Sequence, residues 1–67
     1  MSHIQAVLFP KHFTSHEIHR FVREHKLKPI KPIHETVRFK RLRITEPNYS
    51  RYTTKKLANG IELVLGH

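Results

Sequence analysis

The sequence contains no cysteine and no aspartate, and only two of its 67 residues are glycine. The lack of cysteine excludes both a disulfide framework and a metal site built on thiolates. Because Gly60 and Gly66 are the only glycines, the chain has no glycine-rich phosphate loop, and no pair of carboxylates is placed to hold Mg²⁺. We therefore expect a protein that is not an enzyme and that carries no metal and no cofactor.

Long hydrophobic runs are also missing. The longest run, Ala6 to Phe9, is far shorter than the roughly 20 apolar residues that a membrane span needs. No signal-peptide hydrophobic region precedes a cleavage site. We therefore expect a protein of the cell interior that is neither secreted nor embedded in a membrane.

The length and composition predict one domain over residues 1–67 with a thin core. A chain of this size buries only about 60% of its unfolded surface when it folds. Hydrophobic residues nevertheless make up 37% of the sequence, and no long polar tract of low complexity is present. The chain is therefore expected to fold rather than to stay disordered.

Positive charge is the most unusual property of the composition. Thirteen lysines and arginines stand against five glutamates, which gives a net charge of +8 with neutral histidines. The excess is concentrated in residues 28–43, where six cationic residues stand against Glu35 alone. A field of this kind raises the local concentration of polyanions and speeds their encounter with the protein. Nucleic acid is therefore the first partner to consider, ahead of anionic membrane surfaces and acidic proteins.

The segment FTSHEIHRFVREHKL, residues 13–27, carries the clearest local signal in the chain. Thr14 with Glu17 three residues later is a capping box, and Phe13 before it can pack on Ile18 as a hydrophobic staple. Further apolar positions recur at helical spacing, at Phe21, Val22, His25 and Leu27. The pattern predicts a helix from about Ser15 to Lys26 that packs its one apolar face on a sheet.

Strand patterns lie on both sides of this helix. Residues 4–9 are apolar on both alternating faces except at Gln5, which favours a strand paired centrally or covered on both sides, and Pro10 ends it. The segment KPIKPIH, residues 28–34, contains two prolines and is expected to be an edge strand or an extended connector. Residues 37–45, VRFKRLRIT, form the next expected strand.

A hairpin closes the chain, with Asn59-Gly60 as its turn signal. A two-residue loop would mix apolar and charged partners, whereas a three-residue loop with a left-handed Gly60 separates them. The resulting pairs are Leu57 with Ile61 and Lys56 with Glu62. Together the patterns predict an α+β fold of one helix packed on a small, mostly antiparallel sheet of three to five strands, in the order β-α-β-β-β.

The alternation within residues 37–45 contains a conflict. In a regular strand one face carries Arg38, Lys40, Leu42 and Ile44, and the other carries Val37, Phe39, Arg41 and Arg43. A bulge near Lys40 would turn all the apolar residues toward the core, because one extra residue re-aims those that follow it. Without a bulge, Val37 and Phe39 lie beside the arginines on the open side of the sheet. Both arrangements remain open from the sequence.

Several motifs follow one another along nearly the whole chain: Phe-Pro-Lys at 9–11, His-x-x-Lys-Pro at 25–29, Arg-x-Arg before Glu-Pro at 41–47, and Thr-Lys-Lys-Leu-x-x-Gly-Ile at 54–61. In this order they resemble a family of short uncharacterised proteins encoded by large double-stranded DNA viruses, and related segments accompany some tailed-phage proteins. The resemblance implies a viral protein in the cytoplasm or nucleus of the host cell, or in the virion, and no catalytic residue. Aromatic residues often flank the Arg-x-Arg of such sequences, whereas Leu42 stands here, which weakens the argument for base stacking at this position.

The basic residues form a candidate site for nucleic acid. The guanidinium fork of arginine suits phosphate, and Phe39 or Tyr52 can stack on an unpaired base. No recognition helix, zinc finger or RRM signature is present, so we expect contacts to the phosphates of DNA or RNA without sequence readout. The candidate residues are Lys28, Lys31, Arg38, Phe39, Lys40, Arg41, Arg43, Arg51, Lys55 and Lys56.

Two other interpretations stay open. The charges of the basic strand can simply keep the outer face of a thin sheet soluble. The chain can also be a protein-interaction module, either a virion component or a binder of a host factor, that forms a homo-oligomer or pairs through an edge at residues 28–33. Phosphate binding predicts an affinity that falls steeply with salt, whereas a protein interface predicts a defined complex that persists in salt.

Seven histidines complete the candidate residues. His16 and His19 lie on one side of the expected helix with His12 upstream, which makes a transition-metal site conceivable. Neither cysteine nor aspartate accompanies them, and Glu17 is needed for the helix cap, so we expect exposed histidines without metal. Their protonation below about pH 6.5 would greatly raise the positive charge.

Overall fold

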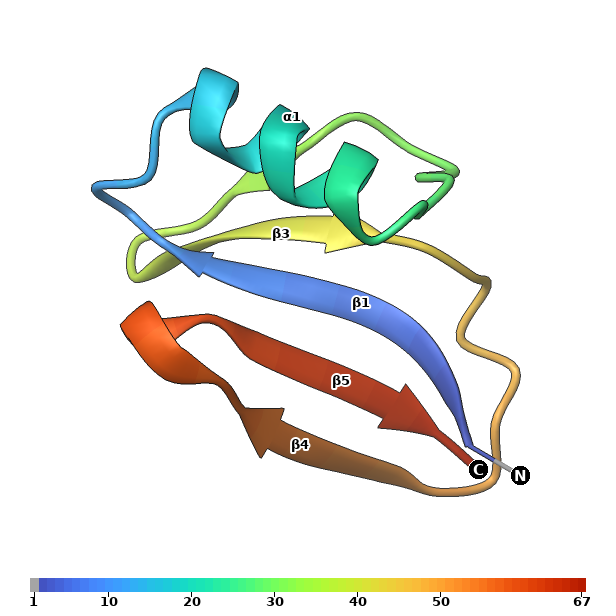
Figure 1. The fold of residues 1–67 in the computed structure, drawn as a ribbon. Helices are drawn as coiled ribbons and strands as arrows, with labels where there is room; N and C mark the ends of the chain where they lie inside the picture. The colour runs from blue at the N-terminus through green and yellow to red at the C-terminus, as the bar shows by residue number, and fades with distance from the viewer. Residues whose placement is uncertain (1) are drawn as a thin grey trace.

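The computed structural model describes residues 2–67 and shows one helix lying across one face of a five-stranded sheet (Figure 1). In chain order the elements are β1 (His3–Pro10), α1 (Ser15–Glu24), β2 (His34–Glu35), β3 (Phe39–Arg43), β4 (Tyr52–Lys56), a short 3₁₀ turn (Ala58–Gly60) and β5 (Glu62–Gly66). The strands lie in the order β2-β3-β1-β5-β4, and every neighbouring pair is antiparallel. The predicted α+β fold of one helix on a small antiparallel sheet is confirmed.

The first strand, β1, lies in the middle of the sheet and pairs with β3 on one side and with β5 on the other. Val7 and Phe9 are fully buried under α1, and Ala6, the residue before Val7, is buried on the opposite face. A strand with neighbours on both sides can bury apolar residues on both of its faces. The predicted central pairing of this strand is therefore confirmed.

A β-bulge in β1 places Gln5 as an extra residue between Ile4 and Ala6. The Gln5 side-chain amide donates to the carbonyl of Thr45 at 2.9 Å. The main-chain carbonyl of Gln5 accepts from the main-chain amides of Ile44 at 2.8 Å and of Thr45 at 3.2 Å. These bonds satisfy a buried polar side chain and tie the end of β1 to the segment that follows β3.

The helix begins at the predicted capping box. The Thr14 amide donates to Oε1 of Glu17 at 2.9 Å, and the Glu17 amide donates to Oγ1 of Thr14 at 3.2 Å. The Glu17 carboxylate is stabilised in its charged form first by the hydrogen bond from the Thr14 amide and second by a bond with the Thr14 side chain. The pKa of Glu17 therefore lies below its ordinary value. The N-terminal boundary at Ser15 is thus confirmed.

The helix ends at Glu24, two residues before the predicted boundary. Lys26 adopts a left-handed conformation with φ 53°, which helical backbone does not allow. Its amide donates to the carbonyl of Arg23, and the Leu27 amide donates to the carbonyl of Val22, which is the Schellman arrangement. The turn directs Leu27 back onto the core.

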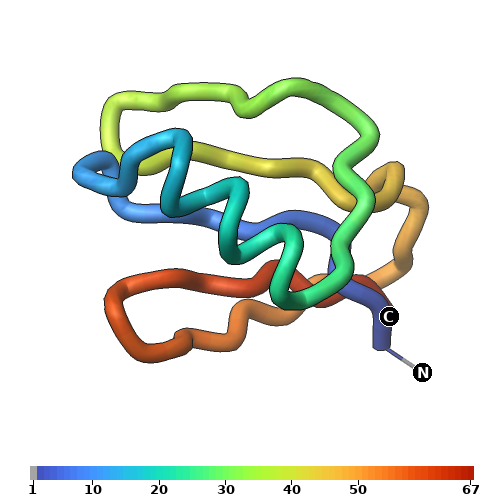
Figure 2. The backbone as a smooth tube through the Cα atoms, turned by 45° about the horizontal axis from the view of Figure 1, so that its top comes forward, coloured from blue at the N-terminus to red at the C-terminus, as the bar shows by residue number. Residues whose placement is uncertain are grey.

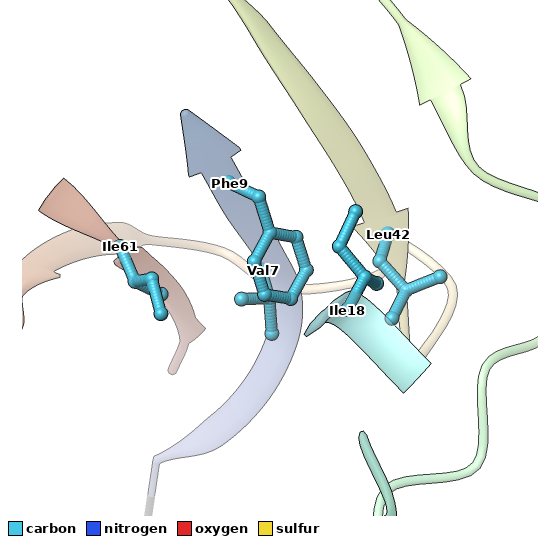
Figure 3. Close-up of a cluster of buried hydrophobic side chains, with 5 residues drawn as sticks. All are labelled: Val7, Phe9, Ile18, Leu42 and Ile61. Carbon is cyan, nitrogen blue, oxygen red and sulfur yellow. The ribbon is translucent and has the colours of Figure 1, made fainter. Parts of the chain in front are cut away.

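The core lies between α1 and the sheet (Figure 3). Its buried members come from β1, α1, β3 and the residue before β5: Val7, Phe9, Ile18, Leu42 and Ile61. The Phe21 ring of the helix meets the Phe9 ring edge-on, with centroids 5.4 Å apart. Leu42 is 3% exposed and Ile44 packs against the same cluster, so the basic strand is anchored by the two residues expected to do so.

Between Leu57 and Ile61 the turn has three residues, Ala58–Gly60, as predicted, and Gly60 is left-handed with φ 82°. The Leu57 amide donates to the carbonyl of Ile61 at 2.7 Å, and Lys56 pairs with Glu62. Ile61 is buried and Leu57 packs against the core. This register determines which residues of β4 and β5 face away from the helix.

The proline-rich segment between α1 and β3 runs along the outer side of β3 (Figure 2). Only His34–Glu35 form a strand there, while the Ile30 amide reaches the carbonyl of Arg43 at 3.0 Å. Pro29 and Pro32 have no amide hydrogen to donate, so the pairing is interrupted and short. Of the two predicted forms, residues 28–33 are a connector without strand structure, and only the short strand β2 at the end of the segment lies at the edge of the sheet.

Candidate functional site

The sheet face opposite α1, which we call the open face, is covered by no helix within residues 2–67 (Figure 1). Successive residues of a strand point to opposite faces, and Val7, Leu42 and Leu63 point toward the helix. Their neighbours in the strand registers therefore define the open face. Its two central rows are His34–Arg41–Leu8–Glu62–Lys56 and Arg43–Ala6–Val64–Thr54.

Arg41 and Arg43 lie next to each other on this face. They are two residues apart on β3, so their Cα atoms are about 6.8 Å apart. Both side chains are half-buried, since their stems pack over the apolar middle of the sheet, where they pair across the strands with Leu8 and Ala6. The two guanidinium groups are thus held on one surface by a strand whose intervening residue, Leu42, is buried in the core.

Phe39 belongs to the same face. β3 pairs with β1 without interruption from Phe39 to Arg43, so no bulge occurs near Lys40. The guanidinium carbon of Arg41 lies 5.6 Å from the centroid of the Phe39 ring, within the range of a cation–π interaction. Val37 precedes the strand and is 95% exposed. Of the two arrangements that the sequence allowed, the structure has the one with an aromatic ring among the arginines.

Three aromatic rings gather at the opposite end of the open face. His3 and Tyr52 pair with Gly66 from either side, and the ring of Tyr49 lies over Gly66 so closely that a methyl group there would overlap it. The centroids of the Tyr49 and Tyr52 rings are 6.0 Å apart, and the Tyr52 side chain remains 42% exposed. Sequence reasoning missed Tyr49. The available signal was Gly66, because a glycine inside a strand often marks a close approach by another group.

A hollow of about 440 Å³ opens at the corner of the open face near Phe39. Its lining includes Leu8, Pro10, Arg38 and Glu62. In a continuous strand Arg38 would lie on the same face as Lys40. Arg38 precedes β3, however, so this alternation does not apply to it. Its side chain extends the row of arginines beyond the end of β3.

Carboxylates are sparse on this face. Glu62 is the one glutamate that the strand registers place there, while Glu17 and Glu24 lie on α1. Glu35 is engaged on the helix side of the sheet, with Lys11 at 3.7 Å and Lys40 at 3.6 Å. Within residues 2–67 no carboxylate oxygen lies within 4.0 Å of a guanidinium nitrogen. The open face therefore has an excess of positive charge that is not neutralised by ion pairs.

Two of the predicted binding residues do not belong to this face. Lys40 points to the helix side, where its side chain is 16% exposed and its Nζ donates to the carbonyl of Phe13 at 2.6 Å. Lys55 is in register with Leu63 and also points to the helix side. The prediction that Lys40 acts with Arg41 and Arg43 on one surface is therefore wrong, because neighbouring strand residues alternate in direction.

The remaining predicted residues are divided between the open face and the segments beside the sheet. Phe39, Arg41, Arg43 and Lys56 are on it, and Arg38 extends it at one corner. Lys31 lines a small hollow with His34 and Arg43 at the β2 edge. Lys28 and Arg51 are exposed in the segments before β2 and β4, respectively. The site is thus narrower than predicted at its centre and gains Tyr49 at one end.

The histidines of the helix, His16 and His19, are exposed. Among residues 2–67 no group of three or more histidine or carboxylate side chains could hold a metal ion. Over the same residues, no helix has the length and apolar character required to cross a membrane.

Comparison with known proteins found no match to this chain among family models, curated proteins or solved structures. The resemblance to proteins of DNA viruses therefore stays a prediction, and the function has to be argued from the open face itself.

Proposed function

We propose that this protein binds nucleic acid through the open face, mainly by contacts to phosphates and without sequence preference. The observation that supports this most is the pair Arg41 and Arg43, which lie side by side on an uncovered sheet face with no carboxylate within 4.0 Å among the described residues. An unneutralised guanidinium pair can bind phosphate oxygens through two donor forks.

The charges around this pair support the same ligand. Arg38 extends the cationic surface at one end, and Lys56 lies in the same row as Arg41 across the sheet. The helix itself is balanced in charge, because α1 carries Glu17 and Glu24 beside Arg20 and Arg23. A polyanion approaching the protein is therefore attracted more strongly to the open face than to the helix.

The lack of sequence preference follows from the shape of this face. A helix or a two-stranded ribbon can enter the major groove, where the bases are distinguished. Here α1 packs on the other side of the sheet, and the arginines project from a central part of a five-stranded surface. Backbone contacts by arginine and lysine position a protein on nucleic acid without reading its sequence.

The test measures binding to fluorescently labelled single- and double-stranded DNA by anisotropy over a salt series. Arg41→Gln combined with Arg43→Gln should weaken binding and reduce the slope of log K against log salt by about 1.8 for duplex DNA, since two phosphate contacts are lost. Arg20→Gln combined with Arg23→Gln is the matched control, because it removes the same charge from the exposed side of α1.

Absence of binding at low salt would refute the proposal. A loss of affinity in the helix variant equal to that in the β3 variant would show that only net charge matters and that the open face is not the site. The family resemblance implies a viral protein of the infected cell or the virion. There, such binding would make the protein an accessory factor of the viral genome or its transcripts.

A second candidate function is that of a protein-interaction module. It is favoured by the free edge of β4, whose five residues are all exposed. Against this candidate, β4 carries Lys55 and Lys56, and lysines on an edge strand oppose pairing with another strand. Light scattering in the same salt series separates the two candidates, because a protein interface gives a defined oligomer that persists at high salt.

A further inference from the structure

The open face carries aromatic rings at two opposite corners. Phe39 stands at the β3 corner, under the guanidinium of Arg41. Tyr49 and Tyr52 stand at the β4 corner, over and beside Gly66. Neither group is part of the hydrophobic core, which lies on the other side of the sheet. Phe39 is half-buried and Tyr52 is 42% exposed, so part of each ring is open to a ligand on this face.

From these two corners, and resting on the proposed function, we infer that the ligand is a single strand of nucleic acid. Its bases stack on Phe39 at one corner and on Tyr52 at the other, and its backbone follows the cations between them. Stacking on aromatic rings does not depend on the base, because every base has a π-face. The inference therefore agrees with binding that has no sequence preference.

The dimensions of the face suit a short strand. Phe39 and Tyr52 are separated by three rows and by three strand spacings, which corresponds to about 20 Å along the strands and about 14 Å across them. The diagonal between them is about 25 Å. Single-strand sites on small sheet domains cover about 4 to 16 nucleotides. We expect this site to fall near the lower end of that range.

The residues along the diagonal leave room for a strand. Its middle is formed by Leu8, Ala6 and Val64, which are apolar and half-buried or buried. Arg41 and Arg43 flank this path on the β3 side. Sugars and bases can lie over the apolar middle while phosphates turn toward the guanidinium groups. Because arginine also stacks on bases, Phe39 and Arg41 form one platform.

A duplex does not fit this arrangement equally well. Its bases are already stacked on one another and present only their edges in the grooves, so the rings of Phe39 and Tyr52 would have no base face to contact. A duplex would still bind to the arginines through its phosphates. The inference thus predicts a preference for single strands that depends on the rings and not on the cations.

The native protein carries its own reporter of stacking. The sequence contains no tryptophan and two tyrosines, and both tyrosines belong to the cluster on the open face. We expect thymidine oligonucleotides from the dimer to the dodecamer to quench the tyrosine fluorescence, with affinity rising to about four nucleotides or slightly more and then levelling off. A duplex of the same phosphate count should bind with little quenching.

Substitution of the rings separates stacking from charge. Phe39→Leu and Tyr52→Leu keep an apolar side chain, and each should weaken single-strand binding about fivefold or more. Duplex affinity and the salt slope should not change. Arg41→Gln with Arg43→Gln should instead weaken both ligands. If Phe39→Leu does not fold, Phe39→Trp tests the same position. This variant should bind single strands at least as tightly as the native protein does. Its tryptophan fluorescence should be quenched by single strands and not by duplexes.

The outcomes distinguish the two levels of the argument. The single-strand inference would be overturned if the native protein bound single strands and duplexes equally well and the ring substitutions did not change that affinity. The proposed function would still hold if the arginine variant lost binding to both. Binding of single strands without tyrosine quenching would also overturn it. Failure of every oligonucleotide to bind at low salt would overturn both.

Discussion

The guanidinium carbon of Arg41 lies 5.6 Å from the centre of the Phe39 ring, on the face of the sheet that the helix leaves uncovered. The two residues are separated by Lys40, whose side chain passes to the other face and bonds to the carbonyl of Phe13. Three consecutive residues thus serve two surfaces. The cationic residues of β3 are consequently not equivalent, and substitutions at neighbouring positions should have different effects.

Lys40→Met should lower the stability of the protein and leave its affinity for nucleic acid close to that of the helix control. The substitution keeps the packing of the stem but leaves the Phe13 carbonyl without its donor, at a cost of about 1 to 3 kcal/mol. Urea unfolding measures the stability, and anisotropy measures the affinity. If the folded Lys40→Met variant lost as much affinity as Arg41→Gln, the result would show that Lys40 does contribute to binding.

Gly66→Ala should destabilise the fold by about 1 to 3 kcal/mol, because the added methyl group overlaps the ring of Tyr49. The tyrosine emission should change as the ring is displaced. In a Tyr49→Ala background the methyl group has space, so the same substitution should cost much less. Equal costs in both backgrounds, measured as a double-mutant cycle, would contradict the packing of Tyr49 on Gly66.

Lys26→Gly should stabilise the protein by about 1 kcal/mol, because glycine adopts the left-handed conformation at the end of α1 without steric strain. Lys26→Ala removes the same charge and keeps the strain, so it is the matched control and should give no such gain. The midpoint of urea unfolding compares the variants. A gain shared by both would point to relief of charge repulsion instead.

The capping box should add a pH dependence to stability in acid. The bonds from Thr14 lower the pKa of Glu17 in the folded protein, so this carboxylate stabilises the fold at pH values above its ordinary, unfolded pKa. The contribution is lost as the pH falls through the lower folded pKa. Glu17→Gln keeps an acceptor for the Thr14 amide but does not titrate, so it should lose less stability than the native protein over this range.

Thermal unfolding of both proteins across acid pH measures the difference. Native and variant curves that run parallel from neutral pH to well below pH 4 would refute the coupling between Glu17 and the cap.

Local features of the fold could be predicted because their causes lie within a few residues of one another. The capping box needs only Thr14 and Glu17, and the β4–β5 hairpin needs only the turn residues and the pattern on either side. Both are observed where they were expected. The helix end was misplaced because a left-handed lysine at position 26 has no marker in the sequence, where glycine is the usual residue.

The candidate site could be predicted only in part. The concentration of charge identified β3 as its centre, and the anchoring of Leu42 in the core predicted that Arg41 and Arg43 face outward together. Lys40 could not be separated from them while a bulge in β3 remained open. Tyr49 could not be placed at all, because its position depends on the loop before β4 folding back over Gly66, a residue of the last strand.

The linear order of residues was thus sufficient for the element types, the cap, the hairpin and the excess of positive charge, because each depends on neighbours along the chain. Tertiary pairing decided which charges share a surface. It placed a bulge in β1 at Gln5 and none in β3, whose regular alternation keeps Phe39 on the same face as Arg41 and Arg43. A shift of one residue in register exchanges the two faces of a strand, so the composition of the open face depends on pairings between strands that local sequence does not specify.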